Sequence, residues 1–186
     1  MADELVETVL WDGGELPFRE LGTLWRTEGG WALRGSVVGS LRGVAFHARY
    51  DVGCGEDWKT RRVFVELSTP PDRHEVLIEV DEALRWRVDG GARPELAGLA
   101  DVDVQLTPST NTLPIRRLAL PVGGEAEVEA AWVTFPRLEV RRLPQRYRRI
   151  GEKLWLYGSG DFRAELEVDE HGLVERYGSF WRRLGG

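Results

Sequence analysis

Short segments in which apolar and polar residues alternate recur along this sequence, and they restrict the fold more than any other feature. In the segment LRWRV at 84–88, three apolar residues alternate with two arginines. Clusters of Gly, Pro, Asp and Asn separate such segments from one another. Because successive side chains of a strand point to opposite faces, the pattern predicts strands with one apolar and one polar face. No long amphipathic helix is evident, so we predict a mainly β, predominantly antiparallel fold.

Two neighbouring segments, 31–39 and 44–50, have the pattern of a hairpin pair. Each keeps its apolar residues on one face, and Gly35, Gly39 and Gly43 are suited to points where a sheet bends. The segment 62–68 carries Phe64 on the face opposite to its other apolar residues, which is typical of a central strand. These segments therefore predict a hairpin and a strand that lies inside a sheet rather than at its edge.

The segment 101–120, DVDVQLTPSTNTLPIRRLAL, predicts a strand, a corner and a short helix. Its first six residues alternate, and Pro108 ends the strand because proline has no donor for the ladder. The side-chain oxygens of 109–112 offer a helix N-cap, and Pro114 fits the first turn of a helix over about 113–118. Arg116 and Arg117 leave this helix on another side than its leucines, and we expect one of them to pair with Asp101 or Asp103.

Length and charge limit the possible functions. The chain has 186 residues, which suits one domain spanning 1–186 with a sizeable core or a core and a cavity. The formal charge of −6 opposes general affinity for nucleic acid. Cys54 is the single cysteine, the first residues are acidic, and no long apolar run follows them. We therefore expect a cytoplasmic protein without an integral membrane segment.

Candidate catalytic groups are few. Asp101 and Asp103 share one face of their strand, and paired carboxylates can bind a cation or divide acid and base roles. A solvated or arginine-paired surface is the structural alternative. The three histidines have no partners at metal-ligand spacing, and no phosphate-binding glycine motif occurs. We expect no metal and no cofactor.

Six arginines fall between Arg137 and Arg149. They predict either a basic face paired with surface acids or a rim that faces an anionic ligand. Binding of single-stranded nucleic acid through these arginines and nearby aromatic residues is a third hypothesis, which the overall acidity opposes.

The segment 101–118 resembles the hallmark of the bacterial putative glycolipid-binding family. WKTR at 58–61 is similar to the family's W-x-T-R element, and Gln145 and Tyr147 match its Q-x-Y. DEHGLVERY at 169–177 matches its D-x-x-G-L-V-x-x-Y ending. The resemblance spans roughly residues 50–183, with only loose agreement before Tyr50.

The resemblance implies a single-domain curved antiparallel sheet, a half-barrel or incomplete barrel with one or two short helices, similar to bacterial lipoprotein carriers. It also implies that a lipid, glycolipid or other small amphiphile binds in the concave interior. The candidate ligand-binding residues are Trp58, Arg61, Asp101, Asp103, Asn111, Arg116, Arg117, Gln145 and Tyr147. Among these, Arg61, Arg116 and Arg117 are suited to a polar or anionic head group.

The leading functional hypothesis is therefore non-enzymatic binding of a lipid-like molecule. The alternative is a hydrolase or isomerase of a small amphiphilic substrate with Asp101 or Asp103 as its base. The sequence names no protein partner, and it leaves open whether segment 101–117 binds ligand or only shapes the fold.

Overall fold

The computed structural model describes residues 2–185, which form one sheet of 15 strands and a single short α-helix. In chain order the strands are β1 Glu4–Asp12, β2 Phe18–Thr27, β3 Gly30–Leu41, β4 Val44–Cys54, β5 Thr60–Thr69, β6 Asp72–Val80, β7 Trp86–Val88, β8 Gly91–Ala92, β9 Asp101–Val104, β10 Glu125–Val133, β11 Val140–Arg149, β12 Leu154–Ser159, β13 Phe162–Val168, β14 Val174–Tyr177 and β15 Trp181–Arg183. The helical elements are the 3₁₀ turns η1 Pro94–Leu96 and η2 Ser109–Asn111 and the helix α1 Thr112–Leu118. The predicted mainly β fold is confirmed.

Successive hairpins build most of the sheet. Its order runs from β8 back to β1, continues with β15, and then runs back from β14 to β9. Every pairing is antiparallel except that of β9 with β10, which is parallel. The predicted hairpin of 31–39 with 44–50 is present, since β3 pairs with β4 from Trp31 opposite Cys54 to Leu41 opposite Val44.

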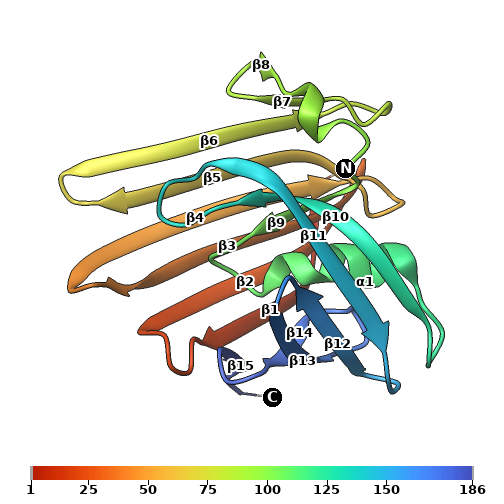
Figure 1. The fold of residues 1–186 in the computed structure, drawn as a ribbon. Helices are drawn as coiled ribbons and strands as arrows, with labels where there is room; N and C mark the ends of the chain where they lie inside the picture. The colour runs from red at the N-terminus through yellow and green to blue at the C-terminus, as the bar shows by residue number, and fades with distance from the viewer. Residues whose placement is uncertain (1, 186) are drawn as a thin grey trace.

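The sheet curls into a half-barrel that does not close (Figure 1). Strands β2 to β6 form a broad curved wall, and β9, η2 and α1 lie across its concave side. Thr60 joins the two walls, because its backbone N–H donates to Ala100 O at 2.9 Å and its hydroxyl accepts from Val102 N at 3.0 Å. The edge strand β9 is thereby held against β5 inside the curve, without a continuous ladder between them.

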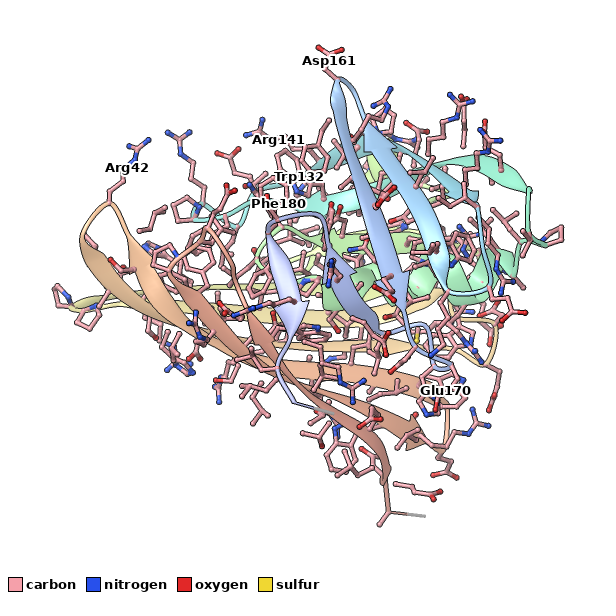
Figure 2. All side chains as sticks on the ribbon, turned by 90° about the horizontal axis from the view of Figure 1, so that it is seen from below. Arg42, Trp132, Arg141, Asp161, Glu170 and Phe180 are labelled. Atoms are coloured by element: carbon pink, nitrogen blue, oxygen red, sulfur yellow. The ribbon has the colours of Figure 1, made fainter. Side chains whose placement is uncertain are left out.

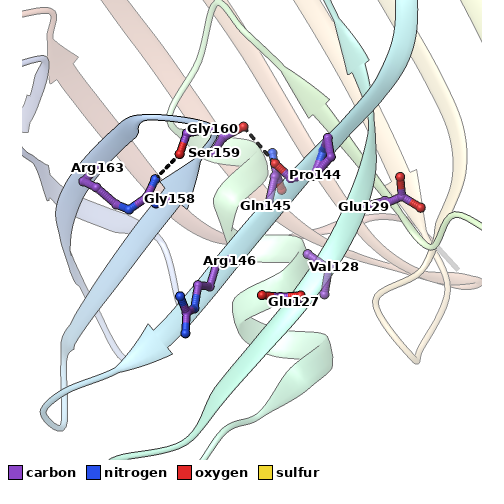
Figure 3. A pocket seen from close by; sticks show the side chains of 10 residues that line it. All are labelled: Glu127, Val128, Glu129, Pro144, Gln145, Arg146, Gly158, Ser159, Gly160 and Arg163. Carbon is purple, nitrogen blue, oxygen red and sulfur yellow. Dashed lines mark hydrogen bonds between the residues drawn. The ribbon is translucent and has the colours of Figure 1, made fainter.

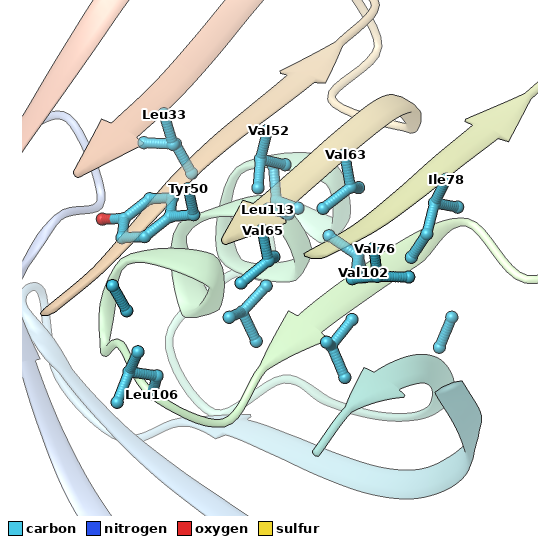
Figure 4. Packing of buried hydrophobic residues seen from close by; sticks show 14 of the residues in the cluster. Leu33, Tyr50, Val52, Val63, Val65, Val76, Ile78, Val102, Leu106 and Leu113 are labelled. Carbon is cyan, nitrogen blue, oxygen red and sulfur yellow. The ribbon is translucent and has the colours of Figure 1, made fainter. Parts of the chain in front are cut away.

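The main core fills the concave space between the two walls. Cross-strand rows such as Leu33, Val52 and Val63 point inward from β3, β4 and β5, and all three are fully buried. Figure 4 shows that Val102 and Leu113, from β9 and α1, face these rows. The predicted apolar face of 101–106 therefore packs on the sheet, and most of the half-barrel interior is occupied by the chain itself.

A second, smaller cluster lies between α1 and the C-terminal strands. It consists of Ile115, Tyr147, Trp155, Tyr157, Leu166, Val168 and Val174. Ile115 therefore packs on a different side of α1 from Leu113, which belongs to the main core. The short helix is buried between the two halves of the sheet.

Two details differ from the predicted strands. The strand expected from residue 84 begins only at Trp86, because Leu84 has a positive φ of 57° and closes a turn with Asp81. Proline is expected to interrupt a strand because it has no donor for the ladder, but β11 runs through Pro144. β12 pairs with β11 only from Arg146 onward, so Pro144 lies where the strand has a ladder partner on one side only.

Gly35 and Gly39 do not simply mark bends. The ring of Tyr50 crosses Gly35 and that of Phe18 crosses Gly39, and a Cβ at either position would lie about 2.5 Å or less from a ring atom. These glycines make room for aromatic side chains of neighbouring strands. Within residues 2–185, no helix is long and apolar enough to cross a membrane.

Candidate functional site

The strand, corner and helix predicted for 101–120 are present, with a different cap. β9 ends at Val104, and η2 leads directly into α1. Asn111, at the N-cap position, has helical dihedral angles and makes no side-chain bond to the first turn. The predicted N-cap is therefore wrong, because the side chains of Thr110, Asn111 and Thr112 bond to other elements. Thr112, for example, donates to Gly172 O at 3.0 Å.

Asp101 and Arg117 form the ion pair expected between the strand and the helix. Arg117 donates to both carboxylate oxygens at 2.9 and 2.5 Å, and Asp101 is 1% exposed. The Asp101 carboxylate raises the pKa of the Arg117 guanidinium, so Arg117 stays protonated, whereas burial raises the pKa of Asp101. This contact fixes α1 against β9.

Asp103 takes part in a second polar contact, and no arginine pairs with it. Gln145 donates from its amide to Asp103 at 2.5 Å and to the Tyr157 hydroxyl at 3.1 Å. The Tyr147 hydroxyl donates to Asn111 Oδ1 at 3.0 Å, and the Asn111 amide donates to Pro108 O at 3.1 Å. Loss of water raises the pKa of Asp103 to about 6, opposed by the Gln145 bond.

Six of the nine candidates thus lie together in what we call the anchor network, consisting of Asp101, Asp103, Asn111, Arg117, Gln145 and Tyr147. It ties β9, η2 and α1 to β11. Tyr157, which the sequence analysis missed, also belongs to this contact region. The alternation of LWLYGS at 154–159 places Tyr157 on an inward face with Trp155, and this signal was available.

The other three candidates lie outside this network. Trp58 is 7% exposed and stacks on Trp31 with ring centroids 4.8 Å apart. Arg116 lies over the Trp58 ring at 5.3 Å and donates to Glu170 O. Arg61 is partly exposed, 3.7 Å from Asp57. Trp58 therefore lies against Arg116 of α1, whereas Arg61 pairs with Asp57.

A large cleft lies elsewhere, at the end of the half-barrel where the hairpin tips β3–β4, β5–β6 and β10–β11 meet. Its volume is about 960 Å³, within the usual range for ligand sites. We call it the apolar cleft. It is lined by Leu16, Phe18, Leu41, Arg42, Val44, Phe46, Leu67, Thr69, His74, Gln105, Leu106, Phe135, Pro136 and Arg137.

Aromatic rings form one wall of the apolar cleft. Phe18 meets Phe46 edge-on at 5.0 Å, and Phe46 meets Phe135 at 4.9 Å. Val44 at the mouth is 53% exposed. An exposed apolar surface that continues inward along aromatic rings is suited to an alkyl chain.

The charged residues of the apolar cleft are all basic. Among the described residues that line it, Arg42, His74 and Arg137 carry or can carry positive charge, and none is acidic. Figure 2 shows Arg42 projecting from the tip of the β3–β4 hairpin. In a chain with a formal charge of −6, this local excess of positive charge favours an anionic group at the mouth.

None of the nine candidate residues lines the apolar cleft. Asp101 and Asp103 are held by Arg117 and Gln145, an arrangement that does not favour the acid–base alternative. No group of three or more His, Cys, Asp or Glu side chains within residues 2–185 is placed to hold a metal ion.

A smaller and more polar cleft of about 500 Å³ opens between β10, β11 and the β12–β13 turn (Figure 3). Glu127, Glu129 and Arg146 face it, and Ser159 donates to Pro144 O across one end. Its carboxylates and its arginines lie close together, so it offers no continuous apolar surface to an alkyl chain.

The arginines between 137 and 149 are largely paired. Ion pairs join Arg137 and Arg141 to Glu139, Arg142 to Glu129, and Arg146 to Glu125. Arg149 donates to the carbonyls of Leu120, Gly151 and Glu152. These contacts fit the paired surface and do not favour nucleic-acid binding; only Arg137 also lines the apolar cleft.

Glu20, next to the apolar cleft, was also missed by the sequence analysis. It is 0% exposed, and burial raises its pKa to about 8 despite hydrogen bonds from Thr107 and Tyr50. The segment 18–24 held a signal, because Glu20 falls on the same face as Phe18 and Leu24. An acid on an otherwise apolar strand face is the kind of exception that marks a functional position.

Comparisons with known proteins agree with this fold. The sequence profile of the family described as putative glycolipid-binding matches residues 8–183, and so extends well before Tyr50, where the sequence analysis found only loose agreement. The crystal structure of a DUF1089 family protein from Pseudomonas aeruginosa is similar, with a TM-score of 0.80 and 30% sequence identity over 89% of this chain and 92% of that one. A search of curated proteins gives no match.

Proposed function

The chain belongs to the putative glycolipid-binding family, and from this premise we propose that it binds a lipid, glycolipid or other small amphiphile in the apolar cleft without transforming it. The observation that carries the proposal is an open cleft of about 960 Å³ whose walls are mainly aliphatic and aromatic. The rest of the half-barrel interior is filled by β9, η2 and α1.

The apolar cleft suits an alkyl chain for a simple physical reason. Each CH₂ group moved from water to an apolar surface contributes about 0.8 kcal/mol, so a chain of several carbons gains most of its affinity here. Phe18, Phe46 and Phe135 present rigid faces to such a chain. Part of this gain is offset by the ordering of a flexible ligand.

The head group of the ligand is proposed to be anionic or to carry an anionic substituent. Arg42 and Arg137 are exposed at the mouth, where charge-assisted bonds form without burying the ligand's charge. His74 adds a third donor on β6. In this proposal the head group contacts Arg42, Arg137 and His74. Arg61, Arg116 and Arg117 remain candidates from the family resemblance alone.

The test uses two matched substitutions in valines of similar exposure. Val44→Trp fills the mouth of the cleft, whereas Val38→Trp adds the same bulk on the outer face of β3, where Val38 is 51% exposed. Protein purified without detergent is examined by native mass spectrometry with lipid extraction, and stearate binding is measured by calorimetry. We expect binding in the wild type and Val38→Trp, and at least a ten-fold loss in Val44→Trp.

Equal loss in both variants would assign binding to another surface. Absence of any adduct, together with no stearate binding by the wild type, contradicts the proposal.

A further inference from the structure

The carboxyl group of Glu20 uses only one of its two oxygens. Tyr50 and Thr107 both donate their hydroxyls to Oε1, each at 2.6 Å. Oε2 is buried, and no described residue offers it a hydrogen bond. Because Oε1 accepts two hydrogen bonds, the proton of the neutral acid belongs on Oε2. The group is then an O–H donor without an acceptor.

A second unused hydroxyl belongs to Ser109, which is linked to Glu20 through Thr107. Ser109 is 1% exposed, and its Oγ has no hydrogen-bond partner among residues 2–185. Ser109 Oγ lies near the Tyr50 hydroxyl and opposes the rise that burial causes in the pKa of Tyr50, but the geometry between the two hydroxyls is not that of a hydrogen bond. Its backbone N–H donates to the Thr107 hydroxyl at 2.9 Å, which places Ser109 in the same group. We call Glu20, Tyr50, Thr107 and Ser109 the Glu20 cluster.

The Glu20 cluster lies directly behind the wall of the apolar cleft. On β2, Phe18 and Glu20 point to the same face at adjacent inward positions, and Phe18 lines the cleft. In the opposite wall, Leu106 lines the cleft and Thr107 is the next residue. The Phe18 ring lies over Gly39 and lines the cleft at the inward position next to Glu20.

Retaining an acid here has a cost in stability. A buried carboxyl group must hold its proton at neutral pH, and a buried donor without an acceptor loses the hydrogen bond it makes to water. Two buried, unused polar atoms within one small cluster of side chains therefore call for an explanation.

Resting on the proposed function, we propose that Glu20 Oε2 and Ser109 Oγ bind an uncharged oxygen atom, a hydroxyl or keto group, on the alkyl chain of the bound amphiphile. Glu20 donates to this oxygen, and Ser109 donates to it or accepts from it. The Phe18 ring turns aside to admit the oxygen. Neither protein group carries charge in this state, so an uncharged partner fits and a second carboxylate is excluded.

The experiment compares stearate with a panel of hydroxystearates that differ only in the position of the hydroxyl group. The proteins are the wild type, Glu20→Met, Ser109→Ala and, as a control, Asp103→Asn, which changes another acid of raised pKa outside the cleft. We expect the wild type and Asp103→Asn to bind at least one hydroxystearate about ten-fold more tightly than stearate. In Glu20→Met and Ser109→Ala this preference falls to three-fold or less, while stearate affinity is retained.

A direct readout accompanies the affinities. The infrared C=O band of the neutral Glu20 acid, assigned by its loss in Glu20→Met, shifts on addition of the preferred hydroxystearate and not on addition of stearate. Circular dichroism checks that each variant is folded.

Stearate binding without any hydroxystearate preference contradicts this inference and leaves the proposed function intact, and it assigns the unused atoms to buried water. A preference that survives in both cluster variants also overturns the inference. If the folded wild type binds neither stearate nor any hydroxystearate, both this inference and the proposed function are contradicted.

Discussion

The anchor network and the Glu20 cluster are two buried polar groups on either side of the same segment, and they differ in how completely their atoms are used. Asp101 has both oxygens bonded to Arg117, and Tyr147, Asn111 and Gln145 bond to one another or to neighbours. Glu20 and Ser109 each keep one buried atom without a partner. A satisfied network stabilises a fold, whereas unused donors next to a cleft are suited to a ligand.

It follows that segment 101–118, which carries the family resemblance, is not where the ligand is proposed to bind. The residues that carry the family resemblance hold β9, η2 and α1 in place. The apolar cleft is built mainly from the hairpins before residue 75 and from 105–106 and 135–137. Four predictions examine this division.

The largest effect is expected when Asp101 is replaced. Asp101→Ala leaves the largely buried Arg117 without its partner, and we expect a loss of about 3 kcal/mol in the free energy of unfolding. Urea denaturation measures it. The surface control Asp51→Ala, whose carboxylate is 44% exposed beside Arg34, is expected to lose about 1 kcal/mol or less. Equal losses of unfolding free energy in the two variants would show that the pair of Asp101 with Arg117 does not anchor α1.

The second prediction concerns Glu20 and pH. Its folded pKa of about 8 exceeds the unfolded value of 4.5, so its stabilising effect is complete below pH 4.5 and falls as pH rises towards 8. Relative to Glu20→Gln, the wild type should lose roughly 1.4 kcal/mol per pH unit across this window, or about 3 kcal/mol between pH 5 and pH 7.5. Denaturation curves at several pH values measure it.

Asp103 also has a raised pKa, so the comparison must be with Glu20→Gln, in which Asp103 is unchanged. If the stabilities of the two proteins change in parallel with pH, the pKa of Glu20 is not raised by folding. The contrast between the anchor network and the Glu20 cluster would then be wrong.

The third prediction separates stability from binding within the anchor network. Tyr147→Phe removes the hydrogen bond to Asn111 Oδ1 and should cost about 1–2 kcal/mol of stability. Because Tyr147 does not line the apolar cleft, we expect the stearate affinity to stay within two-fold of the wild type. A large loss of affinity in folded protein would transfer the ligand site to the anchor network.

The smallest effects are expected at the mouth. Arg42→Asn and Arg137→Gln should each weaken stearate binding two- to five-fold, and the effect should shrink in high salt because these charges are exposed. Asn is chosen at 42 because the residue has a positive φ of 51°. The control is Arg85→Gln, at an exposed arginine that pairs with Asp81 outside the cleft, and it should leave the stearate affinity unchanged. No change in either mouth variant contradicts the anionic head group.

Several parts of the fold were predictable because they depend on local rules. Alternation located β3, β4 and β5, and Pro114 marked the first turn of α1. Local rules failed where another element took the bonding group. Thr112 and Asn111, suited to an N-cap, bond instead to Gly172 and to Tyr147. Pro144 is tolerated because β12 does not pair with that part of β11.

Periodicity and the composition of corners act over a few residues, so the pattern of strands, the short helix and the family follow from the sequence. The pairing of Asp101 with Arg117 and of Asp103 with Gln145 does not, because it depends on how β9 lies against α1 and β11. The same holds for the apolar cleft at the hairpin tips and for Glu20, which lies behind it with an unused oxygen. Such sites join residues from distant segments, and no local pattern specifies how a curved sheet brings them together.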